Sequence, residues 1–163
     1  MQALILAGGF GTRLRPLTSE TPKPAVSLVN RPILSYQLEI LRRAGITEVI
    51  LSLNYQPTRI QEIVGDGSDW GVSVRYVVEP EPLGTAGAVK FAEKFIRETI
   101  VILNGDNLVN LDVAELVAYH RAKGAQMTIV LEKVENPLAY GLVEIDSENR
   151  PTILLANPCR LGQ

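Results

Sequence analysis

The chain has 163 residues, a formal net charge of −2 and a hydrophobic content of 46%. This length supports one domain with its own core, and the hydrophobic content excludes a disordered chain. A net charge of −2 does not indicate the basic surface that nucleic-acid binding usually needs, and no apolar run is long enough to span a membrane. We therefore expect neither a nucleic-acid partner nor a membrane. Cys159 is the single cysteine and the N-terminal residues lack a signal-peptide pattern, which together favour a reducing cytoplasm.

The first predicted strand, Ala3 to Ala7, is an apolar run that ends in the glycine-rich loop G-G-F-G-T-R. Glycines allow backbone N–H groups to approach anionic oxygens, and Arg13 and Lys23 add cations nearby. The pattern therefore predicts a phosphate-handling loop, with a simple tight turn as the alternative. A P-loop ATPase and an NAD enzyme are disfavoured, because Arg13 and Leu14 stand where their motifs require glycine.

Helical and strand patterns alternate along the rest of the chain. Helices are expected at 32–44, 58–64, 83–95 and 112–123, and strands at 48–53, 72–78, 99–103, 126–133 and 141–146. Asp112 and Glu115 have the spacing of a helix N-cap and its third residue. The alternation predicts an α/β fold that is Rossmann-like and doubly wound, with a mostly parallel sheet and helices on both faces. Such sheets bind ligands at the carboxyl ends of their strands, where the glycine-rich loop, residues 79–87 and Asp106 are all expected.

Several motifs in the chain resemble those of one protein family. The stretch G-G-F-G-T-R-L-R-P-L-T, followed by T-P-K-P, closely resembles the signature of sugar-1-phosphate nucleotidyltransferases, also called nucleotide-sugar pyrophosphorylases. The resemblance continues through N-R-P at 30–32, A-G-I at 44–46, P-L-G-T-A-G at 82–87, N-G-D at 104–106 and Y-G at 140–141. The G-T-A-G form looks most like mannose-1-phosphate guanylyltransferases, although similar stretches occur in uridylyl and adenylyl enzymes.

This resemblance implies the nucleotide-diphospho-sugar transferase type of fold and an enzyme that joins a nucleoside triphosphate to a sugar 1-phosphate. The products would be pyrophosphate and a nucleotide sugar, either GDP-mannose or a glucose-type product. Because two anions must meet and no covalent protein intermediate is needed, catalysis would rest on positioning and charge neutralisation.

The resemblance also implies roles for individual residues. Arg13 is expected at the β- and γ-phosphates, Lys23 at the α-phosphate or the sugar phosphate, and Asp106 as a ligand of Mg²⁺, the expected cofactor. Outside this family, an arginine on a loop is often just surface, and an aspartate after a strand is more often a turn or cap residue. The other expected contacts are with the nucleotide, at Leu6, Ala7, Gly8, Gly9, Gly11, Thr12, Pro82, Gly84 and Thr85, and with the sugar, at Tyr140 and Gly141.

The resemblance weakens near the C-terminus. We expect a nucleotide-binding domain over residues 1–146 and a divergent or truncated tail over 147–163, because the family's later E-K-P element and second metal-binding aspartate are missing. Triphosphate binding with Mg²⁺ is therefore expected, with weak or no turnover by this chain alone. Two other hypotheses about the function stay open: a non-catalytic regulatory subunit that senses nucleotide sugars, and a cytidylyltransferase acting on an alcohol phosphate. Self-association into a homo-oligomer is also left open.

Overall fold

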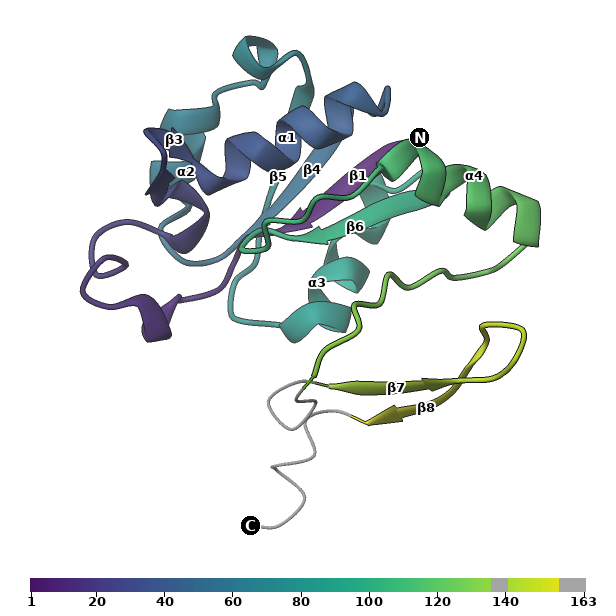
Figure 1. Cartoon of the computed structure of the whole chain (residues 1–163). Coiled ribbons are helices and arrows are strands. Elements are labelled where there is room, and N and C mark those ends of the chain that lie inside the picture. Colours follow the sequence, from purple (N-terminus) through teal and green to yellow (C-terminus); the bar gives the residue numbers. More distant parts are fainter. Residues whose placement is uncertain (136–140, 156–163) are drawn as a thin grey trace. The chain divides into compact units, whose positions relative to one another are not determined.

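The computed structural model describes residues 1–135 and 141–155 (Figure 1). By its internal contacts the chain divides into two compact units, Met1–Tyr119 and His120–Gln163. No helix in the described ranges is long and apolar enough to cross a membrane.

The first unit is built on a four-stranded sheet with the strand order β5-β4-β1-β6. Its strands are β1 (Gln2–Leu6), β4 (Glu48–Leu53), β5 (Ser73–Val78) and β6 (Ile100–Asn104). Every neighbouring pair is parallel, and β1 lies in the middle, where Leu4 is in register with Ile50 on one side and Ile102 on the other. The predicted parallel α/β architecture is therefore confirmed.

Four α-helices connect and follow these strands. They are α1 (Ile33–Arg43), α2 (Pro57–Val64), α3 (Gly84–Ala92) and α4 (Val113–Lys123). Four 3₁₀ turns and one short antiparallel ladder complete the set: η1 (Thr12–Leu14), η2 (Lys23–Ala25), η3 (Ser68–Trp70), η4 (Glu93–Phe95), β2 (Ser27–Leu28) and β3 (Arg31–Pro32). The predicted helix boundaries are confirmed to within a few residues, and the predicted N-cap is confirmed by the Asp112 Oδ1 atom, which accepts a hydrogen bond from the Glu115 N–H at 3.0 Å.

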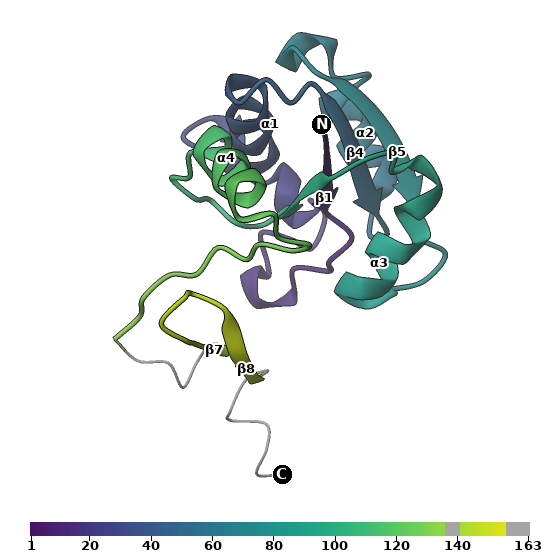
Figure 2. The same ribbon diagram turned by 90° about the vertical axis from the view of Figure 1, so that its right-hand side faces the viewer.

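Side chains alternate between the two faces of the sheet along each strand, and helices pack on both faces. Ala3 and Ile5 of β1 belong to the larger apolar cluster, which takes in α1, α2 and the start of α4. Leu4, between them in sequence, belongs to a smaller cluster that contains Ala92 of α3. Figure 2 shows α1 and α3 on opposite sides of the sheet. This packing fixes the carboxyl ends of the strands, where the loops that carry the candidate site begin.

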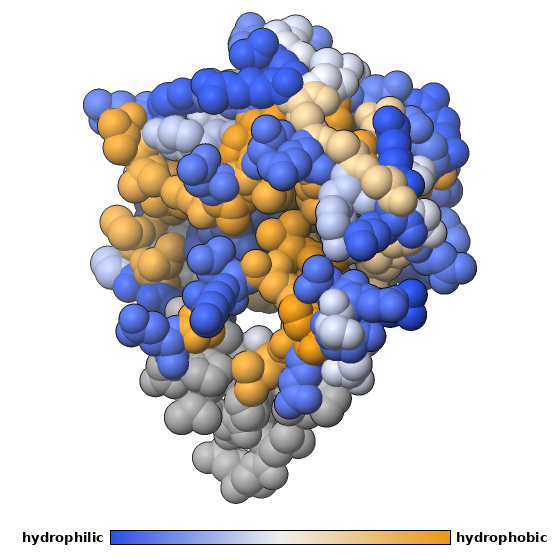
Figure 3. Space-filling view, turned by 45° about the vertical axis from the view of Figure 1, so that its right-hand side comes forward, coloured by the Kyte–Doolittle hydropathy of each residue, from blue (hydrophilic) through white to orange (hydrophobic). Residues whose placement is uncertain are grey.

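The edge of the sheet formed by β6 is more exposed than its centre. Within the described part of the chain, β6 pairs only with β1, and the side chain of Ile102 is exposed. Figure 3 shows further apolar residues gathered on one face of the molecule.

The second unit contains an antiparallel hairpin of β7 (Leu142–Ile145) and β8 (Pro151–Leu155). Asp146 closes its turn, because its Oδ1 atom accepts hydrogen bonds from the backbone N–H groups of Arg150, at 2.8 Å, and Glu148, at 2.9 Å. These hydrogen bonds, led by the one from Arg150, hold the pKa of Asp146 below its ordinary value. The domain boundary predicted after residue 146 falls at this turn and stays a prediction.

The strand predicted at residues 126–133 is wrong. These residues adopt no regular structure, and no described strand pairs with them. Met127 in this segment is 71% exposed. An apolar and β-branched sequence forms a strand only when a partner strand accepts its backbone hydrogen bonds, and the described part of this chain supplies none here.

Candidate functional site

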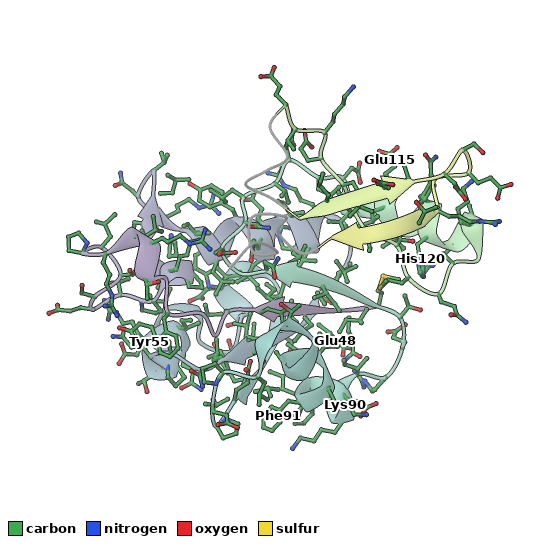
Figure 4. All side chains as sticks on the ribbon, turned by 90° about the horizontal axis from the view of Figure 1, so that it is seen from below. Glu48, Tyr55, Lys90, Phe91, Glu115 and His120 are labelled. Atoms are coloured by element: carbon green, nitrogen blue, oxygen red, sulfur yellow. The ribbon has the colours of Figure 1, made fainter. Side chains whose placement is uncertain are left out.

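A pocket of about 450 Å³ lies at the carboxyl ends of the sheet strands. Its wall is formed by the loop after β1, by η2, by the segment between β5 and α3, and by the end of β6 with the turn that follows. Figure 4 labels Glu48, the first residue of β4, and Tyr55, which follows the carboxyl end of that strand. The Tyr55 ring stacks at a tilt against Phe10, a pocket residue, with 5.3 Å between the ring centroids.

The structure brings nearly all the predicted site residues to this one pocket. Its lining includes Leu6, Ala7, Gly8, Gly9, Gly11, Thr12, Arg13, Lys23, Pro82, Gly84, Thr85 and Asp106. Gly141 belongs to the second unit, and Tyr140 lies outside the described residues. The predicted nucleotide contacts require these residues to share one pocket, and they do. The role of each residue in binding stays a prediction.

The glycine-rich loop is held in shape by close backbone contacts. Gly11 has a φ of +62°, and a Cβ atom there would lie 3.1 Å from both the Lys23 Cβ and the Thr18 Cγ2 atoms. The fully buried Thr18 donates its hydroxyl hydrogen to the Gly11 carbonyl at 2.8 Å. At the start of the loop, a Cβ atom on Gly8 would lie 3.2 Å from the backbone nitrogen of Asn54. The loop therefore approaches its neighbours at distances that larger residues would strain.

Two of the predicted charged residues form an ion pair within the pocket. The Lys23 Nζ atom lies 2.7 Å from the Asp106 Oδ2 atom, with the side chains 27% and 44% exposed. Lys23 is presented by η2, which begins after Pro22 and has Pro24 as its second residue, so its backbone is closely restricted. Arg13 lies on the exposed η1 turn across the glycine-rich loop. Arg13, Lys23 and Asp106 thus line a common pocket together with the glycine-rich loop.

Glu79 is a pocket residue to which the sequence analysis gave no role. Its side chain is buried, with the Oε1 atom accepting the Ser52 hydroxyl at 2.7 Å and the Oε2 atom accepting the Leu83 N–H at 3.2 Å. Asn54 donates to the Glu79 carbonyl at 3.0 Å. Glu79 therefore ties the end of β5 to β4 and to the start of α3. The sequence signal that could have indicated this role is a carboxylate directly after the apolar end of a predicted strand.

The pocket fits a Mg²⁺ ion that a substrate helps to bind. The described residues contain no group of three or more His, Cys, Asp or Glu that could hold a metal ion by themselves. Asp106 supplies one carboxylate to the pocket, and Mg²⁺ is commonly bound by one or two carboxylates together with substrate phosphates and waters. The donor set therefore fits a metal that arrives with a polyphosphate.

Comparison with known proteins shows consistent similarity. The family model described as nucleotidyl transferase matches residues 2–155. A mannose-1-phosphate guanyltransferase of Eremothecium gossypii is 44% identical over 150 residues, which cover 90% of this chain and 42% of that protein. The chain therefore spans less than half the length of this curated relative.

Solved structures extend this similarity to the fold. A Bacillus anthracis protein assigned as a glucose-1-phosphate thymidylyltransferase, crystallised with a sucrose, is 25% identical with a TM-score of 0.90, over 98% of this chain and 65% of that one. HddC from Yersinia pseudotuberculosis, in complex with GMP-PN, is 30% identical with a TM-score of 0.76, over 96% of this chain and 69% of that one.

Proposed function

The chain belongs to the nucleotidyl transferase family, and on that premise we propose that it forms the triphosphate-binding part of a sugar-1-phosphate nucleotidyltransferase. The reaction joins a nucleoside triphosphate to a sugar 1-phosphate and releases pyrophosphate. GTP and mannose 1-phosphate are the leading substrates, because the E. gossypii relative is named a mannose-1-phosphate guanyltransferase and HddC was crystallised with a guanine nucleotide analogue. The convergence of the glycine-rich loop with Arg13, Lys23 and Asp106 on a single pocket carries the proposal.

Each of these groups has a part in handling the triphosphate. The N–H groups of the loop at 8–12 donate hydrogen bonds to phosphate oxygens, and Arg13 binds the β- and γ-phosphates that leave as pyrophosphate. Lys23 neutralises charge on the α-phosphate or the sugar phosphate, as an oxygen of the sugar phosphate bonds to the α-phosphorus and pyrophosphate leaves. Pro82, Gly84 and Thr85 border the nucleobase with small groups that leave the backbone accessible. Bound Mg²⁺ would neutralise charge on the phosphates, and Asp106 is the residue that holds it.

The ion pair between Lys23 and Asp106 suggests how the pocket is kept ready for substrate. Without ligand, each charge is neutralised by the other at 2.7 Å. A triphosphate that arrives with Mg²⁺ offers each of them an opposite charge, so neither has to be left unpaired. Since the pair is partly solvated, we expect that separating it costs about 1 kcal/mol or less.

The proposal is tested in two stages with the purified chain. In the first, the midpoint of thermal unfolding is measured with GTP, ATP, UTP, CTP and dTTP, each with and without MgCl₂. We expect the largest stabilisation with GTP and MgCl₂. Lys23→Met should reduce it, whereas Lys90→Met should not, because Lys90 is an exposed lysine paired with Glu93 outside the pocket. No stabilisation by any triphosphate would refute the proposal.

In the second stage, pyrophosphate release is measured with GTP and mannose 1-phosphate. Binding with little turnover is the outcome expected if residues beyond this chain are needed for the sugar. Strong turnover would extend the proposal to a complete enzyme. A preference for CTP would instead favour the cytidylyltransferase alternative.

A non-catalytic regulatory module that senses nucleotide sugars is the alternative that the sequence left open, and its ligand preference would distinguish it. A regulatory module would be stabilised more by GDP-mannose than by GTP with MgCl₂, and it would release no pyrophosphate. The cytoplasm and a homo-oligomeric state stay predictions.

A further inference from the structure

The turn that carries Asp106 is held from three directions. Residues 104–107 form a turn in which the Asn107 N–H donates to the Asn104 carbonyl at 3.1 Å, so Asp106 is the third of its four residues. Gly105 donates its N–H to the Leu6 carbonyl at 2.8 Å, which attaches the turn to β1. A Cβ atom on Gly105 would lie 3.0 Å from that same carbonyl oxygen, so glycine allows this close approach.

The third attachment comes from a buried side chain of α1. Gln37 is 2% exposed, and its Nε2 atom donates to the Asn104 carbonyl at 2.6 Å and to the Asn107 carbonyl at 2.7 Å. One amide group thus binds the first and last carbonyls of the turn. An amide NH₂ has two hydrogens, and here both are used.

The orientation of this amide follows from its surroundings. If its oxygen and nitrogen were exchanged, the oxygen would lie within 2.7 Å of two carbonyl oxygens, which would repel it. With the nitrogen facing the turn, the buried Oε1 atom has no hydrogen-bond partner within the described part of the chain. Leaving a buried acceptor unpaired is unfavourable, and the two hydrogen bonds to the turn offset that cost. An apolar side chain would avoid the unpaired oxygen but would leave the turn without these two donors.

We propose that Gln37 is a positioning residue for Asp106: it fixes the turn at 104–107 and thereby sets how well the pocket binds Mg²⁺ together with a triphosphate. The part of this inference that concerns Mg²⁺ rests on the proposed function. The part that concerns the rigidity of the turn rests on the hydrogen bonds alone. Gln37 lines no part of the pocket, so it acts only through Asp106.

The test compares two buried polar residues of the same helix. Gln37→Met removes both donors at nearly constant volume, and Gln37→Asn keeps the amide but withdraws it by one methylene. Ser35→Ala is the matched control, because Ser35 is 1% exposed and donates to the Pro32 carbonyl at 2.8 Å, away from the turn. For each purified variant, the unfolding midpoint is measured against MgCl₂ concentration at fixed GTP, and also against GTP without metal.

We expect the MgCl₂ concentration for half of the stabilisation to rise about tenfold in both Gln37 variants, a factor equivalent to the loss of about one hydrogen bond. It should stay unchanged in Ser35→Ala, even where the midpoint itself falls. GTP binding without metal should be the same in all variants. A Gln37 variant with wild-type MgCl₂ dependence would overturn the proposal and leave the proposed function intact.

A second measurement needs no ligand. Backbone amide hydrogen exchange of residues 105–107 should be faster in the Gln37 variants than in wild type or Ser35→Ala, while exchange in the rest of β6 stays the same. Unchanged exchange at the turn would refute the positioning role whatever the pocket binds. If exchange changes but wild type shows no metal-dependent stabilisation by GTP, then the metal part of this inference fails together with the proposed function.

Discussion

Replacing Asp106 by asparagine separates a structural role of this carboxylate from a role in binding. The substitution keeps the shape of the side chain and removes its negative charge. In the structure that charge faces Lys23 at 2.7 Å, and both side chains are partly exposed to solvent. Asp106 lies in a turn whose backbone is held by other residues, so the turn itself should persist.

The expected effect on stability is small. Ion pairs between partly exposed side chains contribute about 0.2–1 kcal/mol, so Asp106→Asn should lower the free energy of unfolding by no more than about 1 kcal/mol. For a chain of this size that corresponds to a midpoint lower by about 2–4 °C. The expected effect on binding is larger, since a ligand at about 100 times its dissociation constant stabilises by about 2.7 kcal/mol. We expect the part of this stabilisation that depends on Mg²⁺ to be lost.

The assay is thermal unfolding with GTP, with and without MgCl₂, for wild type, Asp106→Asn and the control Asp112→Asn. Asp112 is an exposed N-cap residue, and asparagine caps helices about as well as aspartate, so this control changes the same charge outside the pocket. An Asp106→Asn protein that keeps full Mg²⁺-dependent stabilisation would refute our assignment of the metal ligand. A large loss of stability without ligand would show that the carboxylate is mainly structural.

Four further predictions test the pocket and the core. Arg13→Ala should weaken GTP binding about tenfold or more in titration calorimetry, because a charge-assisted hydrogen bond contributes about 1.5–3 kcal/mol, and Arg59→Ala, outside the pocket, should not. Gly11→Ala should lower stability in urea by about 1 kcal/mol or more, since its φ is +62°; unchanged stability would mean that the loop has no such restriction. Glu79→Leu should lower it by about 1–3 kcal/mol, because the Leu83 N–H and the Ser52 hydroxyl then lose their acceptor; a neutral result would contradict these hydrogen bonds. Leu38→Ala in the core should lower the free energy of unfolding in urea by about 2–5 kcal/mol, and a loss below 1 kcal/mol would contradict its complete burial.

Local sequence patterns were enough to predict the strands of the parallel sheet and the edge at which the pocket lies, and the family resemblance supplied the roles of most site residues. The strand at 48–53 was predicted with the bounds that the structure shows, because its apolar run is bordered by polar residues on both sides. The glycine-rich loop, the segment at 79–87 and Asp106 could be placed together in advance, because strands of a parallel sheet end at the same edge. The inference needed the order of elements and no side-chain geometry.

Buried polar residues could not be assigned in the same way. Gln37 was not among the residues used to predict its helix, and its hydrogen-bond partners lie 67 and 70 residues further along the chain. Glu79 opens the segment at 79–87, but local sequence offered no ground to assign it a role, because its carboxylate bonds to Ser52, 27 residues earlier. The false strand at 126–133 has a related cause, since pairing depends on a partner that local sequence does not specify. In each case the deciding contact is distant in sequence.

The place of β1 in the sheet has a consequence for how the protein is made. β1 precedes the other strands of its sheet in the sequence, but it takes a central position and pairs with β6, about a hundred residues later, with Gln2 beside Ile100. Until that partner is synthesised, the backbone N–H and C=O groups along one edge of β1 stay unpaired in the nascent chain, and pairing across so many residues is slow. The loop that we expect to hold phosphate is therefore translated early, but it gains its facing carboxylate only after most of the first unit has been made.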